Sequence, residues 1–266
     1  MTDALQRRIF DELNSLVLID PHTHINPHQP ASSSLADFIG YHYYTELSHS
    51  AGMPRERIEE PGPSPKEKVG RLVEGLGYID NTVQLIWMLE AARELFGVDI
   101  DRLDSSNWES VYDAAQAKFD QPSWEDQVLS LSKLEAVFLT NDFDDPLEGF
   151  DTQRYVSCLR TDELVFHFCK PSVRERLSKC AGVEILSLSD LSSALEQRFR
   201  HFTSRGARAC AISLPPHFAP CQVNDVQAEL ALTKLMSDNE SATDEDKQSV
   251  AYWVFWQLAT YCRDFG

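Results

Sequence analysis

Several features that would assign a chain to a class of protein at once are missing from this sequence. No apolar run approaches the roughly 20 residues of a membrane span, and residues 1–14 lack the apolar core of a signal peptide. Basic residues form no run, and the net charge is −18 at pH 7. Such an acidic chain is expected to repel nucleic acid and anionic membranes, so neither is expected as a partner.

Cysteine is present, but without the spacing of a redox or zinc motif. The six cysteines include no Cys-x-x-Cys pair, and four of them lie in apolar or mixed segments typical of core thiols. Since no targeting segment is visible, the expected compartment is the reducing cytoplasm. The 266 residues, 42% of them hydrophobic, suit one large domain or two small ones with a sizeable core.

The most informative segment is a pair of histidines, His22 and His24, which follows Asp20 and the apolar run at residues 16–19. In a strand, residues two apart point to the same face, so these two imidazoles can lie side by side at a strand end. Neutral imidazole is a common ligand of zinc and similar metals. The pattern predicts half of a catalytic site for a divalent metal, with zinc as the expected ion. The alternative is two surface histidines in a loop.

Hydrophobic periodicity divides the chain into a helical part and a part in which strands and helices alternate. Helices are expected at residues 4–14, 189–204 and 223–262, with a break at 237–246, and through most of 35–130, with a breaker-rich turn at 59–65. Ser64 and Lys66-Glu67, with Pro65, are typical of the start of the helix after that turn. The apolar face of the segment 189–204 is marked by Leu191, Leu195, Phe199 and Phe202, which are spaced at three to four. Strands are expected at residues 16–20, 136–140, 155–159 and 207–214. A weaker strand is expected at 183–186, and a segment that only leads into the next helix is the alternative there.

Alternating strands and helices predict parallel β/α units, and a His-x-His at the end of the first strand suggests a site on the top face of a TIM-type (β/α)8 barrel. Four or five strands fall short of the eight that a barrel needs. We therefore expect an α/β fold in which residues 1–266 form one incomplete metal-dependent barrel, with a helical insertion at 35–130 packed at its top. The sequence is interpreted as the N-terminal part of a larger enzyme, with an open sheet, an exposed apolar edge and a tendency to associate, for example as a homo-oligomer.

Several segments together resemble uronate (glucuronate) isomerase, a family of the amidohydrolase superfamily. The family's Asp-x-His-x-His, Gly-x-His-Tyr, Thr-x-Asp…Asp-Pro and Arg-Pro-Asp motifs are similar to the segments at residues 20–24, 40–43, 140–146 and 160–162. Their order and spacing match along nearly the whole chain. Some phosphoesterases also carry Asp-x-His-x-His. The resemblance is specific because that motif occurs together with Thr-x-Asp…Asp-Pro and Arg-x-Asp.

The resemblance implies an isomerase that converts D-glucuronate to D-fructuronate, or D-galacturonate to D-tagaturonate. Moving a proton between C2 and C1 needs a base, an electrophile for the carbonyl and an anion clamp for the carboxylate of this sugar acid. A metal held by His22 and His24 would supply the electrophile. The resemblance also implies that Tyr43 hydrogen-bonds a substrate oxygen or hands over a proton, and a packed aromatic is the equally open alternative.

Other side chains near strand ends are candidates for the substrate site. Arg160 suits a bidentate contact to the carboxylate, with a salt bridge to Asp162 as the alternative. His217 follows two prolines at a strand end and is the best substitute for the histidine of the family's Ser-Asp-His, which is absent in register. Asp142 is interpreted as a helix N-cap in preference to a partner of a metal-binding histidine. His28 is expected to face solvent, with a third metal ligand as the alternative.

The chain also departs from the family pattern. Thr161 replaces the proline of Arg-Pro-Asp, and the sequence stops before the family's Gln-Leu-His-x-Gly motif and its metal-binding, proton-shuttling aspartate. Two alternatives to the isomerase therefore remain open. One is a metal-dependent hydrolase, which would typically have a lysine or two more histidines on central strands. The other is a non-catalytic partial gene product. The isolated chain is expected to bind metal weakly and to show little or no turnover.

Overall fold

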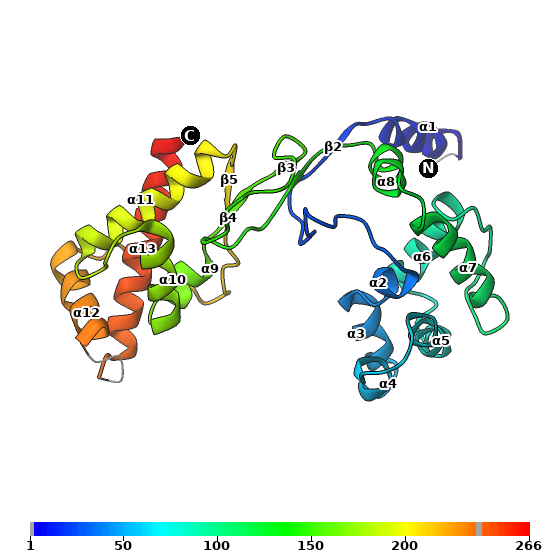
Figure 1. Cartoon of the computed structure of the whole chain (residues 1–266), viewed down its shortest axis with the longest axis horizontal. Coiled ribbons are helices and arrows are strands. Elements are labelled where there is room, and N and C mark those ends of the chain that lie inside the picture. Colours follow the sequence, from blue (N-terminus) through cyan, green and yellow to red (C-terminus); the bar gives the residue numbers. More distant parts are fainter. Residues whose placement is uncertain (1–2, 238–240) are drawn as a thin grey trace. The chain divides into compact units, whose positions relative to one another are not determined.

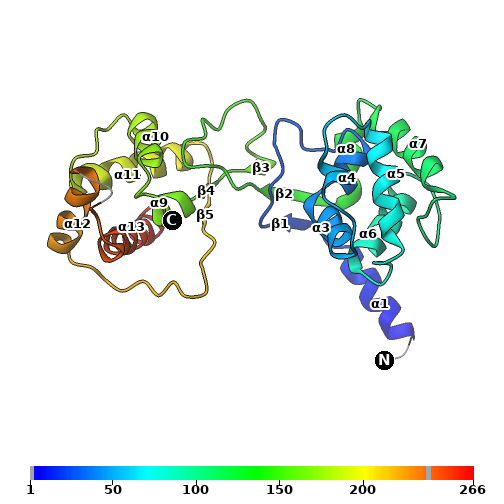
Figure 2. The same cartoon turned by 90° about the horizontal axis from the view of Figure 1, so that it is seen from below.

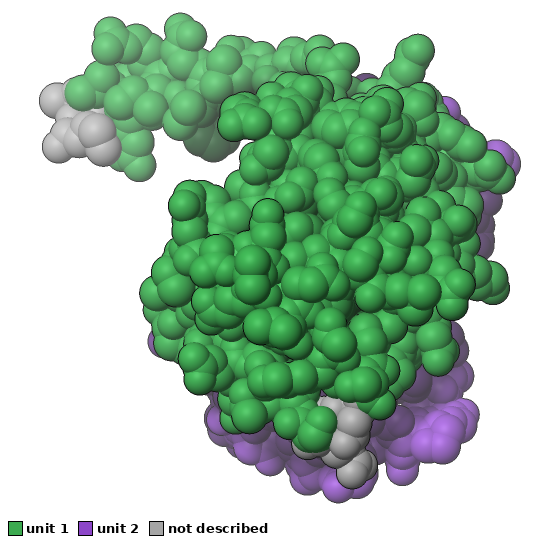
Figure 3. Space-filling view, turned by 90° about the vertical axis from the view of Figure 1, so that its left-hand side faces the viewer, with its two compact units in different colours: residues 1–28, 134–266 green, residues 29–133 purple. Residues whose placement is uncertain are grey.

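The computed structural model describes residues 3–237 and 241–266, without the side chains of residues 42 and 43. The chain forms two compact units, which Figure 3 distinguishes by colour. The first unit comprises Met1–His28 and Leu134–Gly266, and the second comprises Gln29–Lys133. The second unit includes the segment expected to form a helical insertion, and how that insertion packs stays a prediction.

The strands of the first unit are all parallel and follow one another in chain order. Strand β1 (Leu18–Asp20) pairs with β2 (Leu134–Phe138), and β2 pairs with β3 (Tyr155–Val156). Strand β4 (Cys158–Arg160) continues the path of β3 and pairs with β5 (Ala209–Ala211). Because the order never reverses, the sheet resembles part of a β/α barrel more than a doubly wound sheet.

The two groups of strands are joined by the backbone of Asn141, which forms an isolated parallel bridge to Leu159. Its N–H donates to the carbonyl of Cys158 at 3.0 Å, and its carbonyl accepts from the N–H of Arg160 at 2.9 Å. Within the described residues the sheet is open, with β1 and β5 at its edges, and no closed barrel is present. The expected α/β fold with four or five parallel strands is confirmed, whereas a barrel stays a prediction.

The weaker strand expected at residues 183–186 does not form, and the alternative, a segment that only leads into a helix, is confirmed. This segment is a loop between α10 (Pro171–Ala181) and α11 (Leu188–Ser204). Gly182 ends the first helix with φ at +67°, and the Ser187 side chain caps the second by accepting from the N–H of Asp190. The few residues between these two signals reach no partner strand, although Ile185 is buried in the core.

Helices gather on one side of β4 and β5 and pack against one another there, as Figures 1 and 2 show. They are α9 (Asp162–Phe166), α10, α11, α12 (Asp225–Ser237) and α13 (Asp244–Phe265). The apolar face predicted for the segment 189–204 is confirmed, since α11 buries Leu191, Leu195, Phe199 and Phe202. Thr243 and Asp246 form a capping box at the start of α13.

The N-terminal part of the first unit is much less buried. Helix α1 (Asp3–Asn14) confirms the helix expected at residues 4–14, but none of its residues is buried. Exposed large apolar side chains run from this helix into β1, namely Leu5, Ile9, Phe10, Leu13, Leu16, Val17, Leu18 and Ile19. The expected exposed apolar edge is therefore present.

The second unit is entirely helical, in agreement with the helical pattern expected between residues 35 and 130. Its helices are α2 (Leu35–Ile39), α3 (His42–Ser50), α4 (Glu56–Glu59), α5 (Pro65–Leu76), α6 (Val83–Glu94), α7 (Trp108–Phe119) and α8 (Trp124–Ser132). Ser64 and Glu67 form a capping box with Pro65 in the first turn of α5. Across the described residues, no helix combines the length and the apolar character that crossing a membrane requires.

Candidate active site at the carboxyl ends of the strands

The segment that follows β1 is held against the end of β2. The N–H of Thr23 donates to the carbonyl of Phe138 at 3.0 Å, and the hydroxyl of Thr140 lies 2.9 Å from the carbonyl oxygen of Thr23. His22 and His24 flank this anchored residue, and their ring centroids lie 5.0 Å apart at 90°. The expected proximity of the two imidazoles is confirmed, and their role as metal ligands stays a prediction.

The same hydroxyl selects the tautomer of His24. Thr140 Oγ1 also lies 3.2 Å from His24 Nδ1. A hydroxyl has a single proton, and the carbonyl of Thr23 can only accept, so that proton belongs to the carbonyl. His24 Nδ1 must then carry its own proton and donate to Oγ1. In the neutral form of this ring, Nε2 of His24 is then the nitrogen without a proton and is able to bind a cation.

The two histidines provide only part of a metal site. A catalytic zinc ion has three protein ligands as a rule. Among the residues that the structure describes, no group of three or more His, Cys, Asp or Glu side chains could hold a metal ion. His28 is exposed and packs its ring edge-on against Phe150, with the centroids 5.6 Å apart. The residues present thus fit two ligands of a divalent metal, and His28 does not add a third.

Arg160 lies at the end of β4 and is oriented by Asp162. Its Nε is 3.3 Å from Asp162 Oδ2, and the other oxygen of that carboxylate accepts from the N–H of Ser213 at 3.1 Å. The carboxylate therefore ties the end of β4 to the loop after β5. In the described part of the chain the salt bridge engages only Nε of Arg160, so both of the expected interpretations of this arginine remain compatible with its geometry.

A cavity of about 370 Å³ opens beside Arg160, within the size range of small-molecule sites. Its lining is strongly polar and comprises Asp142, Phe143, Arg160, Asp162, Glu163, Phe166, His167 and Arg176. The strand-end residues come from the segments after β2 and β4, so the cavity occupies the position expected of a site in an open α/β sheet.

Arg176 of α10 is already neutralised by two carboxylates of the first unit. It donates to both oxygens of Asp144, at 2.6 and 2.8 Å, and to Glu163 at 2.6 Å. Its hydrogen bond lowers the pKa of Asp144, and its guanidinium lies 4.7 Å from the ring centroid of Phe143. Because Arg176 is committed to these partners, Arg160 is the cation better placed to receive an anionic ligand.

The sequence did not identify Arg176, Glu163 or His167 as cavity residues. No local signal could have found them, since two helices bring them to the strand ends only in the folded unit.

The expectation that Asp142 caps a helix is wrong. No helix begins in this segment, where Asp142 starts a turn in which its carbonyl accepts from the N–H of Asp145 at 3.0 Å. Asp145 precedes Pro146, and a residue before proline disfavours the helical conformation. The turn therefore cannot continue as a helix, and Asp142 lines the cavity instead.

His217 is not brought together with Arg160. It lines a different cavity, of about 200 Å³, together with residues of α9, α12 and α13. Its neighbour Phe218 explains this position, because that ring packs against Phe166 at 5.0 Å and Tyr252 at 5.4 Å. The expected place of His217 at the substrate site is thus not supported by the geometry.

Tyr43 lies in the first turn of α3 in the second unit. Its side chain is outside the described residues. The two interpretations of this tyrosine therefore both stay predictions.

Comparison with known proteins identifies the family. The family model described as glucuronate isomerase matches residues 1–266. The chain belongs to this family. The resemblance that the motifs indicated is therefore confirmed.

Individual relatives agree with this assignment. The chain is 28% identical over 236 residues to the uronate isomerase of Nostoc punctiforme, covering 78% of this chain and 49% of that protein. It is 25% identical over 275 residues to the uronate isomerase of Shouchella clausii, covering 95% and 56%. The chain thus spans about half the length of the curated relatives it matches.

Two solved structures share the fold. Uronate isomerase from Thermotoga maritima aligns with a TM-score of 0.85 at 19% identity, covering 99% of this chain and 61% of that one. Glucuronate isomerase from Caulobacter crescentus also gives 0.85, at 18% identity, with 98% and 58% covered. The arrangement of helices and parallel strands is therefore that of uronate isomerase structures.

Proposed function

We propose that this chain provides the N-terminal part of a uronate isomerase that interconverts D-glucuronate and D-fructuronate, or D-galacturonate and D-tagaturonate. The observation that carries the proposal is the polar cavity at the strand ends, which Arg160 lines within a chain that matches the family along its whole length. A guanidinium oriented through Nε keeps its outer nitrogens available for a carboxylate.

In this proposal each residue of the site has a separate task. Arg160 holds the carboxylate of the sugar acid, and Asp162 fixes the direction of Arg160 through the salt bridge and through Ser213. His22 and His24 would hold a divalent metal, with zinc as the expected ion. When bound, such an ion supplies an electrophile for the substrate carbonyl. The hydrogen bond between Thr140 Oγ1 and His24 Nδ1 supports this assignment, because it directs Nε2 of the neutral ring to be the nitrogen that binds a cation.

Tyr43 and His217 are weaker parts of the proposal. The role of Tyr43 in hydrogen bonding or proton transfer rests on the family motif alone. For His217, the separate cavity that it lines favours a structural role. The hydrolase alternative gains no support from the cavity beside Arg160, whose lining includes no lysine.

We further propose that the parallel strands belong to a TIM-type barrel whose remaining strands come from additional polypeptide. The unreversed strand order supports this, as does the exposed apolar surface of α1 and β1, which further strands and helices would cover. A homo-oligomer is the alternative way to cover the same surface. The free thiols of all six cysteines are compatible with a cytoplasmic protein.

Binding of sugar acids to the chain tests the function without requiring turnover. Saturation-transfer NMR should detect D-glucuronate or D-galacturonate on the wild-type chain, and a weaker signal or none for D-glucose, which lacks the carboxylate. Arg160→Ala should abolish the signal of the acids, whereas Arg208→Ala, an exposed arginine that does not line the cavity, should retain it. Equal binding of glucose and glucuronate, or undiminished binding to the Arg160 variant, would contradict the proposal.

A further inference from the structure

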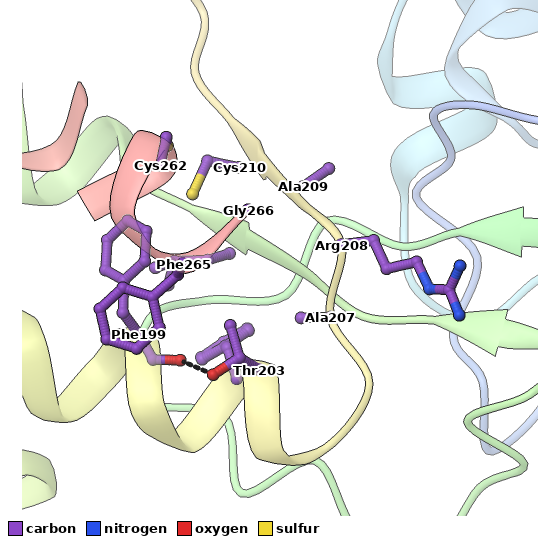
Figure 4. A pocket seen from close by; sticks show the side chains of 11 residues that line it. Phe199, Thr203, Ala207, Arg208, Ala209, Cys210, Cys262, Phe265 and Gly266 are labelled. Carbon is purple, nitrogen blue, oxygen red and sulfur yellow. Dashed lines mark hydrogen bonds between the residues drawn. The ribbon is translucent and has the colours of Figure 1, made fainter. Parts of the chain in front are cut away.

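Two cysteines meet where β5 packs against the end of α13. Cys210 is the central residue of β5, and Cys262 lies in the last turns of α13. Both line a cavity of about 150 Å³ whose other side chains are mostly apolar, including Phe199, Phe202 and Phe265. Figure 4 shows the sulfur of Cys210 directed toward the end of α13.

Regular structure holds both thiols in place. Cys210 pairs in register with Leu159 of β4, so it faces the same side of the sheet as that buried leucine. The end of α13 is fixed on this side by Tyr261 and Phe265, whose rings lie 5.4 and 5.6 Å from the ring of Phe199. The two cysteines therefore meet through the packing of a strand and a helix, not through a mobile loop.

The two sulfurs interact directly and unequally. The two thiols line the same cavity, and the neighbouring thiol of Cys210 lowers the pKa of Cys262 to about 7, while Cys262 raises the pKa of Cys210. Cys262 is also the exposed member of the pair, while Cys210 is partly buried. A thiolate near neutral pH with access to solvent is the form of cysteine that reacts with oxidants.

A third cysteine, Cys158, provides a comparison for the reactivity of the pair Cys210 and Cys262. Cys158 lies on the neighbouring strand, but it pairs in register with Ala209, so it faces the opposite side of the sheet from Cys210. Burial raises the pKa of Cys158 to about 11. This thiol is expected to stay protonated and unreactive.

We propose that Cys262 and Cys210 form a dithiol site that reacts with hydroperoxides, with Cys262 as the attacking residue and Cys210 as the resolving one. The Cys262 thiolate attacks one peroxide oxygen, the O–O bond breaks, and the other oxygen leaves with a proton as water or an alcohol. The sulfenic acid formed on Cys262 then condenses with the Cys210 thiol, which releases water and forms the disulfide. In sum, two thiols are oxidised by two electrons and one hydroperoxide is reduced.

Peptide mapping of the whole chain after treatment with hydrogen peroxide tests this site. Two of the six thiols should be lost, and the new disulfide should join Cys210 to Cys262. In Cys210→Ser, a dimedone adduct should accumulate on Cys262, and in Cys262→Ser the disulfide should not form. Cys221→Ser, which removes another exposed thiol, is the matched control and should form the same disulfide as the wild type.

Alkylation of the untreated wild-type chain provides a measurement that needs no variant. Cys262 should react with iodoacetamide at least about tenfold faster than Cys221 at neutral pH, because more of it is ionised. Equal rates at these two cysteines, or oxidation that yields only disulfides between chains, would overturn the proposal. Neither result would bear on the binding of sugar acids, so the two proposals fail separately.

Discussion

The strands β1 and β4 of the open sheet differ sharply in burial, although each contains a leucine. Leu159 of β4 is 1% exposed, whereas Leu18 of β1 is 48% exposed. Helices α11 and α13 belong to the core that contains Leu159, while Leu18 and the apolar residues of α1 contribute to no buried cluster among the described residues. An apolar strand thus contributes to stability only where later elements of the chain cover it.

The largest effect expected from this comparison is on stability. Leu159→Ala should lower the free energy of unfolding by about 2–5 kcal/mol, because it leaves a cavity in a packed core. Leu18→Ala, the same change at the exposed edge, should cost less than about 1 kcal/mol. Urea unfolding of both variants measures the difference. Similar losses would mean that β1 is covered in solution, which would favour self-association of the chain.

The metal site at the exposed edge gives the next largest effect. Because two histidines supply only part of a ligand set, the chain should bind zinc weakly in isothermal titration. Replacing His22 or His24 with alanine should weaken this binding by at least about tenfold, since each removes a ligand. His28→Ala is the control and should leave binding unchanged. Equal zinc affinity in all three variants would contradict the assignment of His22 and His24 as metal ligands.

The ion pair of Asp144 with Arg176 and the ion pair in α1 should differ in how much stability they lose in acid. Arg176 holds the pKa of Asp144 below its usual value, so the folded carboxylate releases its proton more easily than the unfolded one. The stabilisation is therefore present above the unfolded pKa of about 4 and is lost as the pH falls through the lower folded value. Asp144→Asn should flatten the melting temperature between about pH 5 and 2 relative to wild type.

The matched control for this ion pair lies in α1. Asp11 pairs with Arg7 at 3.3 Å, but both side chains are largely exposed, and such pairs contribute little. Asp11→Asn should leave the pH dependence of the melting temperature as in wild type. A flattening as large as that of the Asp144 variant would show that partial burial does not strengthen the pair between Asp144 and Arg176.

The smallest expected effect is on the tautomer of His24. Thr140→Val keeps the shape of the side chain but removes the hydroxyl that accepts from His24 Nδ1. The lost hydrogen bonds should cost about 1 kcal/mol, and nitrogen NMR should show the ring changing from the Nδ1–H form to a mixture of both forms. An unchanged Nδ1–H signal would mean that another group selects the tautomer.

Local features were predictable from the sequence because their causes lie within a few residues. Ser64 with Glu67 marked the start of α5, and the spacing of apolar residues identified the buried face of α11. The strand that does not form at residues 183–186 and the helix that does not begin at Asp142 also have local causes that the prediction did not weigh. Gly182 and Ser187 left too little chain for a strand, and Pro146 prevented a helix after Asp142.

The sequence by itself determined the helical and parallel-strand elements, the family and the neighbouring positions of His22 and His24, since strand geometry places residues two apart on one face. Only the tertiary structure decided which residues share a cavity. Arg176 reaches the strand end from α10, the ring of Phe218 beside His217 packs against α9, and Cys210 of β5 meets Cys262 near the end of α13. Such meetings depend on how helices pack on a sheet, and no short-range pattern in the chain encodes that packing.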